Sequence, residues 1–389
     1  MSKRRIDWTT GQVYMEKTMA PAVGFSKGPS WVHESPFLPI GWEEGSPFGA
    51  PSLKHLAMRK TLLDQRNLTP ELFASVPWRI ASYLWECLGR SGKKTMYMWK
   101  LFATVYPREF RQIANYRALK IEGPKLPMRD YLGLVKDDAL NWVVALTLST
   151  EFARTPELVD IGNVKNIVAL EISTTPSKPQ PDPDEDAVPV AVLDDRIVRT
   201  WSELAQTSGA FKHLRVLRIY HQEKLSPIVF QYLRVFPSLR VLVVQDCRGL
   251  TPDSAEAVAK TYGWEIGTRP RAKDNNEETD IYDSDTVYEC YEASGPLLDG
   301  ERRGEEPFID PDTPILDFQV GQAVWKGMSK KARKLVFLRK GPIEVNVADP
   351  AMGKRRLEEP EPPNRKKTKK PVMKNLGGKD LTGFLAEFL

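Results

Sequence analysis

The most regular hydrophobic pattern of the chain lies between residues 140 and 245. A six-residue stretch with apolar side chains at its first, fourth and sixth positions occurs four times there. The copies begin at Val143, Ile167, Leu214 and Leu239, and each has a leucine at its fourth position. Successive central leucines are 24, 47 and 25 residues apart, so the middle interval spans about two periods. Short apolar stretches bounded by polar residues predict buried β-strands.

Helical spacing separates these predicted strands, because residues 197–204 and 228–236 carry apolar side chains at intervals of three and four. A strand and a helix every 24 or 25 residues resembles the leucine-rich repeat, in which each unit buries its leucines against its neighbours. The alternative is an ordinary α/β domain with buried parallel strands. Both versions predict the α/β class for residues 121–268. Residues 174–190, rich in Pro and Asp, predict an acidic loop inserted in this domain.

A curved stack of repeats presents the outward residues of its strands on one concave surface. We expect this surface to bind a protein partner, whose identity the sequence does not reveal. Its predicted residues are Thr147, Arg215, Arg218, Arg240 and Val243.

Residues 67–120 contain two amphipathic helical stretches on either side of a glycine-containing turn at 89–92. They resemble a divergent F-box, although the family's Leu-Pro start is Val76-Pro77 here and the turn is unusually basic. That family binds the Skp adaptor of cullin ubiquitin ligases, and leucine-rich repeats commonly follow the box and select the substrate. The alternative is a helical cap on the repeats. The resemblance implies adaptor binding by Val76, Pro77, Ile80, Tyr83, Leu84, Trp99 and Phe102.

Three further segments lack a regular spacing of hydrophobic positions. Residues 1–66 are rich in Gly and Pro yet contain several aromatic residues, which predicts an extended arm that inserts rings into the folded body. Residues 269–312 alternate acidic residues with tyrosines and predict an acidic loop. Residues 313–350 regain apolar content, so we expect them to cap the open end of the repeats.

The net charge of +5 resides in the last segment, residues 351–389, which we expect to be a disordered basic tail. Residues 1–352 hold 46 basic and 46 acidic residues, and a neutral body argues against a large nucleic-acid-binding face. Two basic clusters on a spacer rich in Glu and Pro resemble a bipartite nuclear localisation signal, which predicts an import receptor as partner. The alternative is a tail that improves solubility or attracts RNA weakly. The clusters contain Lys354, Arg355, Arg356, Arg365, Lys366, Lys367, Lys369 and Lys370.

The end of this tail places several apolar residues on one face of a helix, which is typical of a segment that binds a groove. It also resembles the motif that docks on the replication sliding clamp (PCNA), with Thr382 and Leu389 in place of two of its usual anchors. This resemblance supports a second version of the function, a chromatin or replication scaffold without ligase activity. The predicted docking residues are Leu381, Phe384, Leu385, Phe388 and Leu389.

The sequence predicts no catalytic, cofactor or metal site. The three cysteines are far apart, which favours a reducing compartment, and the four histidines lack metal-ligand spacing. Residues 89–95 echo a phosphate loop, but Cys87 replaces its first glycine and a helix stands where a strand is required. No apolar run is long enough to span a membrane. We therefore predict a non-enzymatic nuclear adaptor, in its first version a substrate receptor of a Skp–cullin–F-box ligase.

The predicted import signal is testable by deletion. Removing residues 353–370 from a fluorescent fusion should make it cytoplasmic, because both basic clusters are lost. Fluorescence microscopy of the full-length fusion gives the reference. Continued nuclear accumulation of the deleted fusion would contradict the import prediction.

Overall fold

The structure is a computed structural model of the 389-residue chain. It describes residues 2–6, 13–17, 31–40, 49–174, 191–267, 281–282, 284–299, 309–310, 312–321 and 334–339. The predicted tail of residues 351–389 and residues 175–190 of the predicted acidic insert lie outside the described residues.

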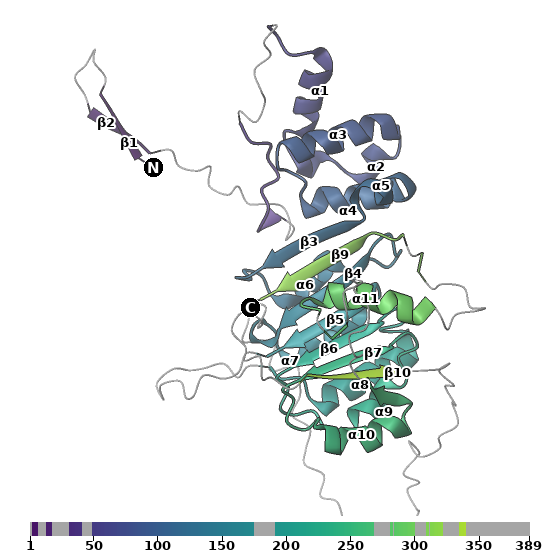
Figure 1. Ribbon diagram of the computed structural model, residues 1–389. Helices are drawn as coiled ribbons and strands as arrows, with labels where there is room; N and C mark the ends of the chain where they lie inside the picture. The colour runs from purple at the N-terminus through teal and green to yellow at the C-terminus, as the bar shows by residue number, and fades with distance from the viewer. Residues whose placement is uncertain are drawn as a thin grey trace, which may run out of the picture. The chain divides into compact units, whose positions relative to one another are not determined.

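The fold is mixed α/β, as the sequence predicted, and its described part is built on an eight-stranded sheet (Figure 1). The strand order is β3-β9-β4-β5-β6-β7-β10-β8. The first six strands in this order run parallel, whereas β10 is antiparallel to both β7 and β8. The strands are β3 (Tyr116–Ile121), β4 (Val143–Ser149), β5 (Ile167–Ser173), β6 (Val216–Tyr220), β7 (Val241–Gln245), β8 (Trp264–Ile266), β9 (Ile315–Val320) and β10 (Lys334–Arg339).

The four strands predicted from the repeated pattern are β4 to β7, and their central leucines pair in register. Leu146 lies opposite Leu170, Leu170 opposite Leu217, and Leu217 opposite Leu242. All four side chains are fully buried. Burying one such side chain contributes about 1.5–3 kcal/mol, so this row of leucines is a main source of the sheet's stability.

Helices between successive strands cover the leucine face of the sheet. The largest, α8, begins after Asp194, whose carboxylate accepts a hydrogen bond from the backbone N–H of Ile197, and ends at Gly209, which has a positive φ of 68°. Its Trp201 is fully buried and donates its indole N–H to the Leu158 carbonyl at 2.9 Å. The helical elements on this side are α6 (Met128–Val135), η3 (Thr150–Phe152), α7 (Thr155–Asp160), η4 (Ile161–Asn163), α8 (Asp195–Ser208), α9 (Val229–Leu233) and α10 (Pro252–Thr261).

Helix α11 (Val287–Asp299) lies against the opposite face of the sheet (Figure 1). Its buried side chains Val287, Cys290 and Ser294 follow the helical spacing of three and four residues. Val287 and Cys290 belong to a hydrophobic cluster with the small strand residues Ala145, Ala169, Val216, Val241 and Val243. The sequence predicted an acidic loop over residues 269–312, so α11 corrects that prediction. The buried stripe is narrow, and the surrounding Glu and Tyr residues obscure its period.

A buried ion pair lies on the same face of the sheet. Glu171 on β5 lies opposite Arg218 on β6, with 3.2 Å between the carboxylate and the guanidinium Nε, and both side chains are at most 3% exposed. The single N–H of the Arg218 Nε donates to the Tyr220 hydroxyl at 2.6 Å, so its contact with Glu171 is one between charges. Burial raises the pKa of Tyr220, so this hydroxyl stays neutral. The three side chains form a polar cluster inside the sheet layer.

Strands β9 and β10 come from the segment 313–350, which the sequence predicted as a cap at the open end of the repeats. Strand β9 instead lies between β3 and β4, with Phe318 opposite Leu146. Its alternate residues Leu316, Phe318 and Val320 are fully buried, which explains why it occupies an interior position. Strand β10 pairs with β7 at the other side of the parallel strands.

The N-terminal helices have an aromatic core. The ring of Trp85 lies 5.1 Å from that of Phe102 and 4.8 Å from that of Phe110. Such aromatic contacts add about 0.5–1.5 kcal/mol each beyond area burial. The helices are α1 (Leu53–Leu62), η2 (Gln65–Asn67), α2 (Pro70–Phe73), α3 (Trp78–Arg90), α4 (Met96–Val105) and α5 (Pro107–Ala114).

The segment predicted as an extended arm, residues 1–66, contains regular structure. Helix α1 begins after Ser52, whose hydroxyl accepts a hydrogen bond from the His55 backbone N–H. Strands β1 (Ser2–Ile6) and β2 (Val13–Lys17) pair antiparallel. Trp31 is buried with its ring 4.9 Å from that of Tyr97, so one aromatic residue of this segment does insert into the body.

The Glu171–Arg218 pair yields a stability prediction. Arg218→Met leaves the Glu171 carboxylate buried without its counter-charge and should lower the free energy of unfolding by about 3–5 kcal/mol. The double substitution Glu171→Met with Arg218→Met removes both charges and should cost less than the single one. Urea unfolding measures both. A double variant whose loss equals the sum of the two single losses would contradict this coupling.

Candidate functional site

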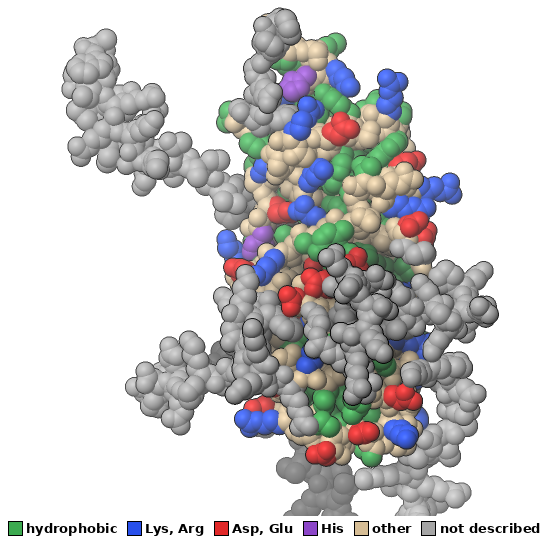
Figure 2. All heavy atoms as spheres, in the orientation of Figure 1, with side chains coloured by type: hydrophobic (Ala, Val, Ile, Leu, Met, Phe, Trp, Pro, Cys, Tyr) green, Lys and Arg blue, Asp and Glu red, His purple; other side chains and the backbone are tan. Residues whose placement is uncertain are grey.

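Exposed hydrophobic side chains concentrate on the N-terminal helices. Among the described residues, eleven large hydrophobic side chains are exposed, and seven of them lie between Phe37 and Ile80. Over these helices, hydrophobic side chains reach the surface among charged ones (Figure 2). We use the name helical apolar surface for the five that lie on or directly after α1, α2 and α3, which are Leu53, Leu56, Leu63, Leu72 and Ile80.

The residues predicted to bind a Skp adaptor fall into two groups. Val76, Pro77, Ile80 and Tyr83 are exposed or half-buried, and Ile80 keeps 53% of its surface accessible. By contrast, Leu84, Trp99 and Phe102 are buried in the core of the helices. These three side chains are therefore not accessible to a partner while the helices are packed.

Sequence reasoning missed the contribution of α1 to this surface. Leu53, Leu56 and Leu63 fall in the segment predicted as an arm. A signal was available, because a serine directly before a stretch of good helix formers is typical of a helix start. The Lys54 ammonium lies 3.7 Å from the centre of the Tyr83 ring, which brings α1 against α3.

Three of the predicted partner-binding strand residues, Thr147, Arg218 and Val243, alternate with the leucines and lie on the face that α11 covers. Thr147, Arg218 and Val243 are buried, and Arg215 and Arg240 are half-buried. The Arg215 guanidinium lies 5.7 Å from the centre of the Tyr291 ring on α11. With α11 in place, a partner has no access to the buried three.

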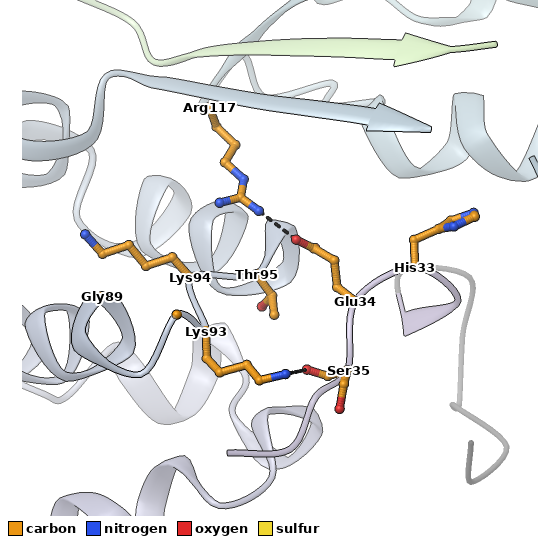
Figure 3. A pocket seen from close by; sticks show the side chains of 9 residues that line it. His33, Glu34, Ser35, Gly89, Lys93, Lys94, Thr95 and Arg117 are labelled. Atoms are coloured by element: carbon orange, nitrogen blue, oxygen red, sulfur yellow. Dashed lines mark hydrogen bonds and ion pairs between the residues drawn. The ribbon is translucent and has the colours of Figure 1, made fainter. Parts of the chain in front are cut away.

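A cavity of about 440 Å³ adjoins the turn between α3 and α4 (Figure 3). Helix α3 precedes this turn, so the glycine-lysine stretch is not the strand–loop–helix of a phosphate loop. Three of the lining side chains are cationic and one is acidic. The cavity is lined by His33, Glu34, Ser35, Gly89, Gly92, Lys93, Lys94, Thr95 and Arg117.

The turn that forms this cavity is held by its own backbone and by Gln65. Gly92 has a φ of +64°, a conformation that glycine adopts without strain, and the Lys93 backbone N–H donates to the Leu88 carbonyl at 2.8 Å. The buried Gln65 amide donates to the Lys93 carbonyl at 2.9 Å, and its oxygen accepts from the Thr95 hydroxyl at 2.5 Å. Lys93 and Lys94 are thus fixed at the start of α4.

The Glu34 carboxylate lies in this cavity with both oxygens bound. One oxygen accepts from the Met96 backbone N–H at the start of α4, at 2.6 Å, and the other accepts from the Arg117 guanidinium, also at 2.6 Å. Figure 3 shows Arg117 and Lys93 reaching residues 34–35 from opposite sides. Helix starts and arginine side chains are common binding partners of anions.

His33 adjoins the cavity as a neutral side chain. The Tyr131 hydroxyl accepts backbone hydrogen bonds from Lys125 and Leu126, so its own proton points to the His33 Nε2 at 2.7 Å. An imidazole nitrogen that accepts a hydrogen bond in this way carries no proton of its own. Burial, with a smaller effect of the Lys125 charge, lowers the pKa of His33, in agreement with this assignment.

The remaining predicted sites lie outside the described residues. These are the import clusters between Lys354 and Lys370 and the docking residues between Leu381 and Leu389. Among the residues that the structure describes, no group of three His, Cys, Asp or Glu side chains is placed to hold a metal ion. None of the described helices combines the length and the apolar character needed to cross a membrane.

A comparison with known proteins gave no match to a family model, to a curated protein or to a solved structure.

The rate at which a reagent labels the Cys290 thiol tests whether α11 stays packed on the sheet. This thiol is 1% exposed, and burial raises its pKa to about 11, so maleimide should label it slowly at pH 8. Val287→Asp buries a charge beneath α11 and should speed labelling of Cys290 by about tenfold or more. Peptide mass spectrometry distinguishes labelling of Cys290 from labelling of Cys87 and Cys247.

Glu292→Gln, on the exposed side of α11, is the control and should leave the labelling rate unchanged. Equal labelling of Cys290 in the Val287→Asp variant and in the unmodified chain would contradict the stable cover.

Proposed function

We propose that this chain is a nuclear adaptor that binds another protein through the exposed face of its N-terminal helices. The observation that carries the proposal is the helical apolar surface. Single exposed hydrophobic residues are ordinary on a protein surface, whereas a contiguous patch of them marks an interaction site, and our proposal takes these five side chains as parts of one such patch. We use the name sheet unit for the eight strands and the helices that cover them, within residues 116–339. It supports this contrast, because only Phe152 and Ile228 are large exposed hydrophobic residues on its described helices and connections.

The partner in this proposal is a Skp adaptor, on the basis of the F-box resemblance. Pro77 and Ile80 are accessible and belong to the stretch that carries the resemblance. Burying one side chain of the size of Ile80 contributes about 1.5–3 kcal/mol, which corresponds to an affinity change of about tenfold or more. The buried Leu84, Trp99 and Phe102 keep these accessible residues in place.

The sheet unit has a separate part in this proposal. A leucine-rich-repeat array would select the substrate of the ligase, and the in-register leucines of β4 to β7 support such a stack. Because α11 covers the predicted strand face, the substrate either displaces α11 or binds the outer face of that helix. The predicted nuclear signal would direct this assembly to the nucleus.

Direct binding to a purified Skp adaptor, measured by isothermal titration calorimetry, tests the proposal. Substitution of buried residues such as Trp99 would disturb the fold, so the informative variants are Ile80→Asp and Leu72→Asp on the surface. Each should weaken binding by about tenfold or more, because a charge replaces a buried apolar contact. Ile228→Asp, at a comparably exposed position on the sheet unit, is the matched control and should bind normally.

Absence of binding by the unmodified chain, or equal affinity of the Ile80→Asp variant, would reject the Skp-adaptor version. The melting temperature of each variant shows whether a loss of binding reflects a loss of fold.

A further inference from the structure

The cavity beside the α3–α4 turn has more positive charge than its own acidic residue neutralises. Lys93, Lys94 and Arg117 line it together with the single carboxylate of Glu34. In the described part of the chain, neither lysine ammonium forms an ion pair. That of Lys93 donates to the Ser35 carbonyl at 3.4 Å, and that of Lys94 lies 4.8 Å from the centre of the Trp85 ring.

The binding geometry already accepts an anion, because Glu34 occupies it. Its two oxygens use one backbone N–H at the start of α4 and one guanidinium, which together are typical donors to a phosphate. A carboxylate has only two oxygens and one charge, so it leaves the two lysines of the cavity without an acidic partner.

A phosphate monoester matches the cavity better than a carboxylate does. It carries about −1.5 to −2 charges at pH 7 and three acceptor oxygens. Two of these oxygens can take the donors that now hold Glu34, and the third can accept from Lys93 or Lys94. The size of the cavity, about 440 Å³, accommodates a phosphate group with a few attached atoms.

We propose that this cavity binds a phosphate monoester, which displaces the Glu34 carboxylate from the start of α4 and from Arg117. The displacement requires the Glu34 side chain to rotate away from both of its donors. The segment around it stays attached through the Gln65 N–H to Pro36 carbonyl and Leu38 N–H to Leu63 carbonyl hydrogen bonds, at 3.0 and 3.2 Å. Glu34 is therefore a built-in competitor that lowers the affinity for phosphate.

The test is a titration of the full chain, followed by the amide resonance of Met96 in a ¹H–¹⁵N correlation spectrum at constant ionic strength. The probes are inorganic phosphate and N-acetyl-O-phosphoserine methylamide. Both should shift the Met96 resonance saturably, because its N–H changes its acceptor. Glu34→Gln removes the competing charge and should lower the half-saturating concentration by about tenfold.

Two further variants locate the site. Arg117→Gln or Lys93→Gln, each in the Glu34→Gln background, should raise the half-saturating concentration again by about tenfold or more. Lys165→Gln removes the same charge from an exposed position of the sheet unit and should have no effect. Ile80→Asp should also leave this titration unchanged, so phosphate binding and Skp-adaptor docking succeed or fail separately.

The two probes distinguish the source of the phosphate. Tighter binding of the phosphoserine compound indicates a phosphorylated protein side chain, and equal binding indicates a small free phosphate. The proposal is overturned if the Met96 resonance does not shift saturably up to about 50 mM of either probe. It is also overturned if Glu34→Gln binds no more tightly than the unmodified chain, or if Lys165→Gln weakens binding as much as Lys93→Gln does.

Discussion

The central strands of this protein run parallel, and a parallel sheet is stable when both of its faces are covered. The leucine row from Leu146 to Leu242 fixes one face against the helices that connect the strands. The other face has small residues such as Ala145 and Ala169, which leave room for a helix at close range. Helix α11 meets this requirement by covering the second face. In doing so it buries the strand residues that an open array of repeats would expose to a partner.

The polar cluster beneath α11 constrains the register of the strands that carry it. A charged pair inside a sheet layer is costly to desolvate and stabilises little in total, but it penalises any arrangement that separates its members. Glu171 and Arg218 are on adjacent strands at the same level. A shift in register between β5 and β6 would bury two separate charges, so the pair favours the observed register.

Sequence patterns were sufficient for some elements and insufficient for others. The strands β4 to β7 were predictable because each buries a leucine at a regular interval. Helix α11 was not, since its buried stripe contains only Val287, Cys290 and Ser294 within an acidic segment. The position of β9 in the sheet was equally unpredictable, because an alternating apolar pattern predicts a strand but not which strands it pairs with. At the cavity, Lys93 and Lys94 were visible in the sequence, whereas Glu34 and Arg117 come from distant segments that only the fold brings together.

The position of β9 has a consequence for the order in which the chain is made. Strands β3 and β4 are synthesised early, yet the strand that lies between them begins only at Ile315. Ribosomes add roughly 5–20 residues per second. The facing edges of β3 and β4 therefore remain unpaired for on the order of ten seconds or more. During that time they are open to wrong pairing with other chains. The growing polypeptide therefore exposes two unpaired strand edges until residues 315–320 have been made.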